Sequence, residues 1–461
     1  MIDALRLTLG WGVAWLVGIA IVAALLRATL KRDGTLAWTI GCGYFAGAFV
    51  VTAWMRVLSF AGIAFSIASI ALPLVIATAA LAWYARPAWR ATSFSNSSTT
   101  RGERWVIYGV ATWLAVRFVV LLLDVLFTPL YPWDAWIQWA TKARVWYALG
   151  HIVPFARSDA WFAANGALWF DASPNYPATV PLWQVWSSVA LGRWDDALMN
   201  LPWWLTAVAF AVAIFGALRE SGMRAPVAII GAWIASSLPL ANVHVALAGY
   251  ADLPMTAYYA LAAVAAWRWT QDRTFGNAVL ALMLAIACVT IKTPGVVWAA
   301  TLVPGVVLAL LPRHGPRIVA IGLAAVLLVL AVLAQTDPVV LGYRLHLDFA
   351  PAWQALIASL FLLGNWHLAW YVTIAATVIG WKEIRAPALA PLSVTVGAGA
   401  LFLLVAFAFT NARNWVSDQT TINRALLHLV PLALVWTMLV LHAWYVRQRS
   451  SAATTPVAVA A

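Results

Sequence analysis

One stretch of the chain carries ionisable side chains at a spacing that could support proton transfer. Asp134, Gln138 and Lys142 recur every four residues between positions 131 and 147, in the sequence YPWDAWIQWATKARVWY. Residues four apart share one face of an α-helix, so the carboxylate and the ammonium would point the same way. The other face is largely aromatic: Trp136, Trp139, Ala143 and Trp146. This pattern predicts a helix in a membrane interface, with tryptophans at the lipid headgroups and charges toward an outer cavity.

Simpler roles explain parts of this pattern. Asp134 follows Pro132 and Trp133 at the expected start of the helix, where a carboxylate can cap free backbone N–H groups. A capping carboxylate stays ionised at neutral pH and can still accept a proton from a hydroxyl group. The tryptophans suit membrane anchoring better than sugar stacking, and Lys142 and Arg144 could reach lipid phosphates. The sequence leaves both interpretations open.

Further polar residues cluster near the ends of apolar runs. Three groups stand out: His244, Tyr250 and Asp252 in HVALAGYADLPM; Lys292 in TIKTPG; and Arg413, Asp418 and Arg424 in NARNWVSDQTTINR. Lys292 and Arg424 fall on the side of the membrane that disfavours basic residues, so both require partners. An anionic ligand such as a phosphate would supply one, and an ion pair between Lys292 and Asp252 would also do so.

Histidines and one arginine complete the polar set. No two histidines stand at metal-ligand spacing, so His244 and His346 are candidate substrate contacts rather than metal ligands. Arg117 lies in the middle of an apolar run, where a charge is costly in lipid. It is expected to face other helices, with Asp124 as its partner two turns along.

The composition requires a membrane protein. Of the 461 residues, 64% are hydrophobic and 10% are charged, which leaves too little polar surface for a soluble fold of this length. The formal net charge of +12 fits membrane topology better than nucleic-acid binding, because basic residues gather between apolar runs. Cys42 and Cys288 lie far apart in apolar runs and are predicted to be packing residues rather than a disulfide or a metal site.

Apolar runs long enough to cross roughly 30 Å of hydrocarbon recur along the whole chain. They cover residues 7–26, 36–58, 62–84, 105–127, 196–218, 225–246, 251–269, 275–291, 294–311, 317–334, 366–381, 389–409 and 424–446. The first run has no small-residue cleavage site after it and is expected to remain as a helix. The sequence therefore predicts an all-α, polytopic membrane protein with about 13 transmembrane helices.

Basic residues between the runs predict the topology. Alternating sides through the runs collects most of them on one face, which the positive-inside rule makes cytoplasmic. The amino terminus is then outside and the carboxyl terminus inside. The longest outer loop covers residues 128–195 and carries, at 175–192, a second predicted interfacial helix. The two interfacial helices would form a lip around a lateral opening.

The chain is expected to have four parts. Residues 1–84 form a three-helix amino-terminal portion. Residues 85–104, which include TSFSNSSTTRGER, are predicted to be a flexible cytoplasmic linker. A transmembrane core with the loop 128–195 follows at 105–334. Residues 335–461 hold a second outer loop, with Arg344, and the last helices.

Four segments in a fixed order carry a family resemblance. They read WDAWIQWATKARVWYALG, SPNYPATVPLWQVW, GYADLPMTAYYALA and TIKTPGVVW, within residues 105 to 310. Together they resemble lipid-linked-sugar glycosyltransferases of the GT-C superfamily, such as protein O-mannosyltransferases, aminoarabinose transferases and the transferases that decorate bacterial lipopolysaccharide. The resemblance implies a GT-C-like core at 105–334 and a bacterial inner-membrane enzyme whose active site faces the periplasm.

The resemblance also implies roles for single residues. Asp134 matches the loop aspartate that acts as general base, deprotonating an acceptor hydroxyl that attacks the sugar with inversion. Lys292 matches the lysine that holds the polyprenyl phosphate of the donor, which is the leaving group. The remaining candidate substrate-binding residues are Lys142, Arg144, Asp171, Tyr176, His244, Asp252, Arg344 and Arg424. The chemistry is consistent, because a leaving phosphate needs cations and an attacking hydroxyl needs a base.

Two departures from the family pattern bear on metal use. Ala135, Ser173 and Asn175 stand where many relatives have an acidic residue or a histidine. Asp171 is the one carboxylate nearby that could replace them. We therefore expect no cofactor.

The expected activity is transfer of a sugar from a polyprenyl-phosphate donor to a periplasmic acceptor, which is a lipopolysaccharide, another glycan, a lipid or a protein. The expected partners are that donor, that acceptor and the bilayer, without nucleic acid. One alternative is a transporter or flippase for a lipid-linked intermediate, which predicts midplane polar residues and two related halves. The other is a non-catalytic assembly protein that uses the loop as a binding surface.

Overall fold

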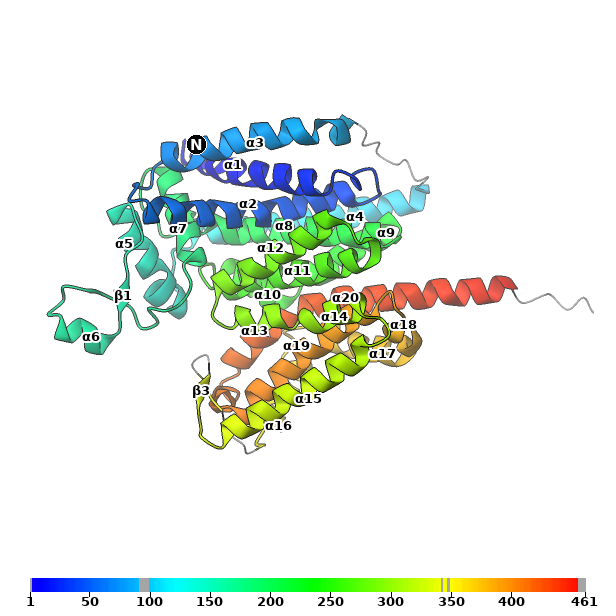
Figure 1. The fold of residues 1–461 in the computed structure, drawn as a ribbon. Coiled ribbons are helices and arrows are strands. Elements are labelled where there is room, and N and C mark those ends of the chain that lie inside the picture. The colour runs from blue at the N-terminus through cyan, green and yellow to red at the C-terminus, as the bar shows by residue number, and fades with distance from the viewer. Residues whose placement is uncertain (1, 91–98, 341–342, 346–348, 455–461) are drawn as a thin grey trace, which may run out of the picture. The chain divides into compact units, whose positions relative to one another are not determined.

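The computed structural model describes residues 2–90, 99–340, 343–345 and 349–454, and they are helical almost throughout (Figure 1). The described part of the chain has two small sheets, each with two short strands. In one, β1 (Phe155–Ala156) pairs parallel to β2 (Trp169–Phe170); in the other, β3 (Val339–Val340) pairs antiparallel to β4 (Tyr343–Arg344). The predicted all-α, polytopic membrane fold is confirmed.

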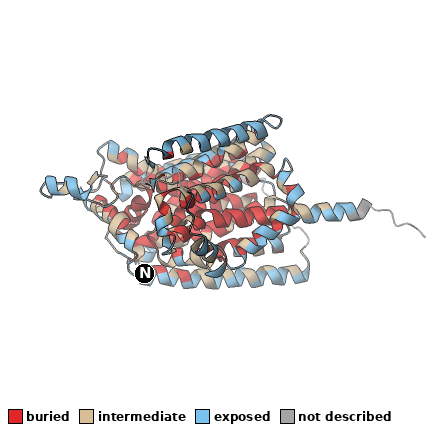
Figure 2. Cartoon of the chain, turned by 90° about the horizontal axis from the view of Figure 1, so that it is seen from below, coloured by how far each residue is buried: buried red, intermediate tan, exposed pale blue. Residues whose placement is uncertain are grey.

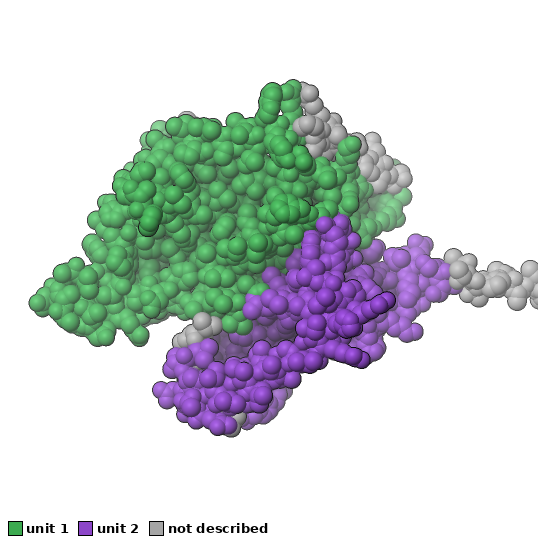
Figure 3. Space-filling view, in the orientation of Figure 1, with its two compact units in different colours: residues 1–265, 274–299 green, residues 266–273, 300–461 purple. Residues whose placement is uncertain are grey.

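The chain forms two compact units (Figure 3). Unit 1 contains residues 1–265 and 274–299, and unit 2 contains 266–273 and 300–461. The long helices that begin in unit 1 are α1 (Ile2–Leu25), α2 (Thr35–Phe60), α3 (Ile67–Arg90), α4 (Arg101–Phe127), α8 (Leu201–Glu220), α9 (Ala225–Ser236), α10 (Pro239–Ala246), α11 (Asp252–Asp272), α12 (Phe275–Ile291) and α13 (Gly295–Ala300).

The loop 128–195 and the turn after it contribute shorter elements to unit 1. They are η1 (Ala135–Ala140), α5 (Thr141–Leu149), α6 (Ser158–Ala163), α7 (Thr179–Leu191) and η2 (Leu198–Asn200). Unit 2 contains α14 (Val303–Leu310), α15 (Gly315–Ala334), α16 (Trp353–Ile357), η3 (Ala358–Leu362), α17 (Ala369–Ile379), α18 (Trp381–Arg385), α19 (Ala390–Phe409), η4 (Asn411–Trp415) and α20 (Thr420–Thr454).

Every predicted apolar run overlaps a helix, but the predicted number of about 13 spans is not confirmed. Among the described residues, eight helices are long and apolar enough to cross a membrane, or nine if the bent pair α9 and α10 forms one span. Of the remaining runs, 251–269 lies in α11, which has 21 residues but is not among those eight, and the others form shorter helices. The run 366–381 contains α17 with 11 residues, and the run 294–311 is divided between α13 and α14.

Helix occupies both ends of the predicted linker 85–104, because α3 continues to Arg90 and α4 begins at Arg101. A capping box starts α4: the Thr100 side chain accepts a hydrogen bond from the Glu103 N–H, and the Glu103 carboxylate accepts one from the Thr100 N–H. This arrangement satisfies two backbone donors at the helix start. Residues 91–98, which include most of the serine-rich stretch, lie outside the described residues.

Small residues allow α1, α2 and α8 to pack at backbone contact. A β-carbon on Gly18 of α1 would lie 1.8 Å from the Gly43 carbonyl oxygen, and one on Gly47 would lie 1.7 Å from the Ala14 carbonyl oxygen. Gly43 and Gly47 form a G-x-x-x-G pair, which is typical of helices that pack closely in membranes. On the α8 side, a β-carbon on Gly41 would lie 2.4 Å from the nitrogen of Ala213. Thus α2 packs directly against α1 on one side and α8 on the other, with no side chain between the backbones at these glycines.

At the break between α9 and α10, a side chain from a neighbouring helix hydrogen-bonds to the freed backbone carbonyl group. The two helices are bent by 62° where Pro239 starts α10. Arg117 of α4 donates hydrogen bonds to the Ser237 carbonyl oxygen at 3.3 Å and to Asn242 Oδ1 at 3.0 Å. A freed carbonyl in a membrane requires such a donor. The predicted pairing of Arg117 with Asp124 is therefore wrong, because the guanidinium stabilises the helix break.

Burial separates the helices that build the interior from those that face outward. Buried residues concentrate where helices face one another (Figure 2). Exposed apolar side chains run along α3 and α15, such as Leu72 and Ile321, and this surface is what lipid hydrocarbon would cover. By contrast, α7 has Val189 as its one residue that is not fully buried. The prediction of an interfacial helix at 175–192 is wrong, since α7 is buried on all sides within the protein.

Candidate functional site

Asp134 lies in the first turn of the helix that continues as η1 and α5. Its backbone has helical angles, with φ −63° and ψ −28°, and its side chain makes no capping hydrogen bond. Instead, the Pro132 carbonyl oxygen accepts the first hydrogen bonds of the helix, from the N–H groups of Ala135 and Trp136. The carboxylate is half-buried. The capping interpretation of Asp134 is therefore wrong.

The helix changes pitch directly after Asp134. Residues Ala135–Ala140 are π-helical, so their hydrogen bonds skip one residue more than in an α-helix. The four-residue spacing used to place Asp134 and Lys142 on one face consequently fails. Lys142 is 1% exposed, and the prediction that its ammonium points toward an outer cavity beside Asp134 is wrong. Trp139 and Trp146 are buried inside the protein rather than at the lipid headgroups, whereas Trp136 is exposed.

Lys142 and Asp171 form a buried ion pair. Lys142 Nζ lies 3.5 Å from Asp171 Oδ1 and donates a hydrogen bond of 2.7 Å to the Ser173 carbonyl oxygen. The Ser173 N–H donates to the same Asp171 Oδ1 at 2.6 Å. Asp171 Oδ2, also buried, has no hydrogen-bond partner among the described residues. The pair joins α5 to the segment that precedes α7.

Burial shifts the protonation equilibria of this pair. It raises the pKa of the Asp171 carboxyl above its ordinary value, and it lowers the pKa of the Lys142 ammonium. Each partner's charge opposes the shift of the other, but desolvation is the larger effect in both cases. The pair stabilises the loop geometry around the helix that bears Asp134.

A second charged pair forms where α11 begins and α12 ends. Lys292 Nζ lies 2.6 Å from Asp252 Oδ1, which is one of the two alternatives that the sequence left open for Lys292. Asp252 is fully buried at the first residue of α11, and Lys292 is half-buried directly after α12. An anion at a helix N-terminus and a cation at a helix C-terminus both interact favourably with the helix dipoles. Pro294 and Gly295 then turn the chain back, and a β-carbon on Gly295 would lie 2.1 Å from the Cys288 carbonyl oxygen.

One glycine brings the helix of Asp134 against the turn that leads to Asp252. Gly249 has a φ of +106°, and a β-carbon there would lie 2.6 Å from Ala135 Cβ and 2.7 Å from Leu130 Cδ1. Its backbone therefore touches the residue next to Asp134. On the other side of this turn, Trp203 Nε1 donates a hydrogen bond of 2.7 Å to the Tyr250 carbonyl oxygen. The turn that leads to Asp252 thus packs directly against the helix that bears Asp134.

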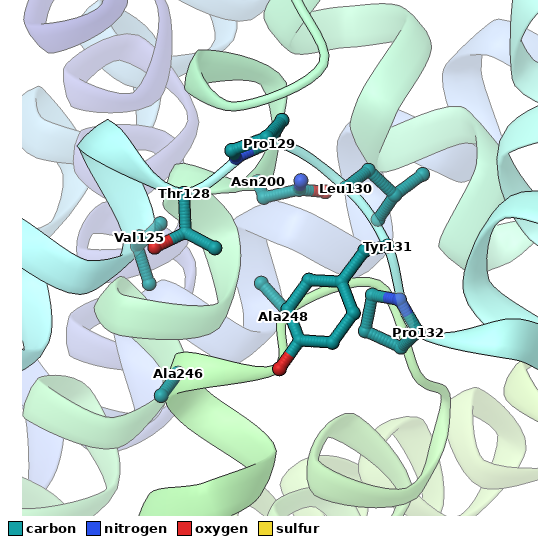
Figure 4. A pocket seen from close by; sticks show the side chains of 9 residues that line it. All are labelled: Val125, Thr128, Pro129, Leu130, Tyr131, Pro132, Asn200, Ala246 and Ala248. Atoms are coloured by element: carbon teal, nitrogen blue, oxygen red, sulfur yellow. The ribbon is translucent and has the colours of Figure 1, made fainter.

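A small, open pocket of about 10 Å³ lies beside this contact (Figure 4). It is lined by Val125, Thr128, Pro129, Leu130, Tyr131, Pro132, Asn200, Ala246 and Ala248. Figure 4 shows the segment from Thr128 to Pro132, which leads into the helix of Asp134, on one side, and Ala246 and Ala248 on another. The lining is mostly apolar, with hydroxyl groups from Thr128 and Tyr131.

Three further predicted residues of unit 1 surround these groups. The ring of half-buried Tyr176 lies 5.1 Å from the ring of Trp139, and the ring of buried His244 lies 5.4 Å from that of Tyr250. Arg144 is exposed and its guanidinium lies over the Trp194 ring at 5.6 Å. Their predicted roles in substrate binding stay predictions.

The remaining two predicted residues lie in unit 2. The Arg344 N–H donates a hydrogen bond of 2.8 Å to Asn411 Oδ1, next to a bridge between Leu345 and Thr410. Arg424 is half-buried in the first turns of α20. The predicted contact His346 lies outside the described residues. Within the described ranges, no group of three His, Cys, Asp or Glu side chains could hold a metal ion.

One cation close to the predicted site is absent from the sequence-based predictions. Arg56, in the last turns of α2, donates a hydrogen bond of 2.7 Å to Thr179 Oγ1 at the start of α7. Thr179 Oγ1 in turn donates to Thr290 Oγ1 at 3.0 Å, two residues before Lys292. The signal in the sequence was a basic residue near the outer end of an apolar run, where the positive-inside rule disfavours it.

The comparisons with known proteins do not add a family. No protein-family model matches this chain, and neither the curated proteins nor the solved structures contain a match.

Proposed function

We propose that the protein is an integral membrane glycosyltransferase, which transfers a sugar from a polyprenyl-phosphate donor to an acceptor hydroxyl with inversion. The observation that carries the proposal is the contact of Gly249 with Ala135, through which one turn connects Asp134 to the Asp252–Lys292 pair. A carboxylate and a cation are the two groups that the reaction needs from the protein. The family resemblance of the four segments supports the same assignment.

In the proposed reaction, Asp134 accepts the proton of the acceptor hydroxyl as the oxygen attacks the anomeric carbon. The bond between that carbon and the phosphate oxygen breaks on the opposite face of the sugar. Lys292 stabilises the negative charge that develops on the leaving polyprenyl phosphate. Asp252 holds the Lys292 ammonium in place at 2.6 Å.

The test is loss of the product when the proposed base is neutralised. Asp134→Asn keeps the shape of the side chain but cannot accept the proton, so transfer should fall by about 10²- to 10⁴-fold. The measurement is the mass spectrum of lipid and glycan extracts from a deletion strain complemented with each variant. We expect a sugar mass increment to appear with the wild type and to disappear with Asp134→Asn.

A matched control is Asp159→Asn, which changes an exposed aspartate of the same loop. It should restore the increment fully. Membrane abundance and melting temperature of each variant show that the protein is present and folded. A normal increment with Asp134→Asn would remove Asp134 from the mechanism. No difference between deletion strain and parent in any extract would count against glycosyl transfer itself.

The break between α9 and α10 favours transport of a lipid-linked intermediate as a second candidate. Discontinuous helices often form binding sites in transporters. Cys42 and Cys288 are buried, so engineered cysteines at Thr128 and Tyr131 can be labelled with little background. A transporter predicts that impermeant reagents reach these pocket positions from both sides of the membrane in turn. A glycosyltransferase predicts labelling from one side.

A further inference from the structure

We infer that Arg56 is a second cation of the site that contains Lys292, and that the two together bind the phosphate group of a phosphate ester. The inference rests on the proposed function, because it assigns the ligand of the same site. It adds a residue from α2, which lies outside the four segments that carry the family resemblance.

Arg56 lies on the side of unit 1 that carries the loop 128–195. The end of α2 is tied to this loop, since the Ser59 hydroxyl oxygen accepts a hydrogen bond of 2.9 Å from the Ile152 N–H. Arg56 is three residues earlier in the same helix and reaches Thr179, which begins α7 within the loop region. The placement is independent of any assumption about membrane orientation.

A chain of hydroxyl groups connects Arg56 to the Lys292 turn. Thr179 Oγ1 accepts from Arg56 Nη2 at 2.7 Å and donates to Thr290 Oγ1 at 3.0 Å. Thr290 lies on the last turn of α12, and Lys292 follows that helix directly. Thus α2, α7 and α12 meet here, and Arg56 and Lys292 lie at the same end of the bundle.

The charge of Arg56 is not balanced by the protein. A guanidinium has five N–H donors and prefers two oxygens of a carboxylate or phosphate. Among the described residues, Arg56 forms no ion pair, and its one hydrogen bond goes to a neutral hydroxyl. Since the residue is half-buried, water cannot solvate it fully. An anionic ligand with several acceptor oxygens would satisfy the remaining donors.

Other arginines at this end of unit 1 are either balanced or exposed. Arg193 pairs with Asp3 and with Asp195, at 2.9 and 2.6 Å. Arg6 is exposed and donates to the Leu191 carbonyl oxygen at 2.8 Å. Arg56 therefore differs from both, and Arg6 supplies a matched control.

Binding is measured on the detergent-purified full chain, as the change in melting temperature with increasing undecaprenyl phosphate. Arg56→Gln should weaken the affinity about tenfold to hundredfold, as expected for loss of charged hydrogen bonds to a phosphate. Arg56→Lys should retain part of the affinity, and Lys292→Gln should weaken it as Arg56→Gln does. Arg6→Gln should bind as the wild type does.

Thr179→Val separates ligand binding from a structural role of Arg56. It removes the hydrogen bond to α7 but keeps the guanidinium, so most of the phosphate affinity should remain. Equal losses in Thr179→Val and Arg56→Gln would overturn the inference, because Arg56 would then act by holding α7. Wild-type affinity in Arg56→Gln would overturn it as well.

The source of the phosphate is distinguished by parallel titrations with phosphatidylglycerol and inorganic phosphate. Preference for undecaprenyl phosphate supports a donor site. Equal affinity for phosphatidylglycerol would overturn the assignment to the donor and identify a lipid-headgroup site. The binding assay contains no acceptor, so it does not depend on Asp134: Asp134→Asn should bind undecaprenyl phosphate normally even if it transfers no sugar.

Discussion

At the scale of single residues, unit 1 uses two buried carboxylates in the same way. Asp171 fixes Lys142, and Asp252 fixes Lys292, each through one carboxylate oxygen. The first pair is sealed, since both side chains are at most 2% exposed, whereas the Lys292 side chain is 14% exposed. We therefore regard the first pair as a support for the loop and the second as the pair that a ligand can reach.

Removing one member of the sealed pair should destabilise the protein. Lys142→Met leaves the Asp171 carboxylate buried without a counter-ion, at a cost of about 3 to 5 kcal/mol at neutral pH. The double variant Lys142→Met/Asp171→Leu removes both charges and should recover most of the loss. Thermal unfolding in detergent measures the difference, with Asp159→Asn as an exposed control. A melting temperature of Lys142→Met equal to that of the wild type would contradict this role.

The sealed pair should also give stability a defined pH dependence. Because burial raises the pKa of Asp171 above 3.8, the folded chain binds this proton more tightly than the unfolded chain does. The contribution is greatest below the unfolded pKa and is lost as pH rises through the folded pKa. Lys142 has a lowered pKa, so its own contribution is present at alkaline pH and is lost as pH falls through its folded pKa.

Between the raised folded pKa of Asp171 and its unfolded value of 3.8, Asp171 is the member of the pair that takes up a proton as the pH falls. The wild type should therefore gain stability over this range relative to the double variant Lys142→Met/Asp171→Leu. Melting temperatures of both proteins across the range give the comparison. Parallel curves would show that the pair does not titrate there.

At the scale of elements, glycines let neighbouring helices approach to backbone contact, and side-chain hydrogen bonds hold a broken helix in place. The contact of α1 with α2 depends on Gly18, Gly43 and Gly47, because any β-carbon there would overlap backbone atoms. At the turn before α11, a β-carbon on Gly249 would instead meet the side chains of Ala135 and Leu130. The broken helix α9–α10 depends instead on the donors of Arg117. Close packing of these helices thus fixes the position from which Arg56 reaches the loop 128–195.

Gly47→Ala should separate α1 from α2. The added methyl group would lie 1.7 Å from a backbone oxygen, so the helices must move apart, at a cost of about 1 to 3 kcal/mol. Gly12→Ala on α1 meets no atom within 4 Å and should leave stability unchanged or slightly raised. The melting temperatures of the two variants show whether stability requires the glycine contact between α1 and α2. Equal values would show that the glycine contact is not required.

At the scale of the whole molecule, the number of spans determines which sides the termini occupy. An odd number, such as nine or 13, places them on opposite sides, and an even number, such as eight, places them on the same side. The bent pair α9 and α10 is the element on which the count of eight or nine depends. Basic residues predict an outer amino terminus and an inner carboxyl terminus.

Reporter fusions test this topology. Alkaline phosphatase inserted between residues 164 and 168 should be active, because the loop 128–195 is predicted to be outside. Green fluorescent protein at the carboxyl terminus should fluoresce, because that end is predicted to be inside. An active phosphatase at the carboxyl terminus would contradict the predicted orientation and favour an even number of spans.

The sequence by itself determined the class of protein and the position of nearly every helix, because hydrophobicity over a run of residues is a local property. It also offered the Asp252–Lys292 ion pair as one of two ways to balance Lys292, since both charges lie at the ends of apolar runs. Tertiary structure alone decided the rest. The π-helical turn after Asp134 buried Lys142, and packing on all sides turned the predicted interfacial helix 175–192 into the buried helix α7. Arg56 joined the site only because α2 packs beside α7 and α12, a contact between residues more than a hundred positions apart that no local pattern encodes.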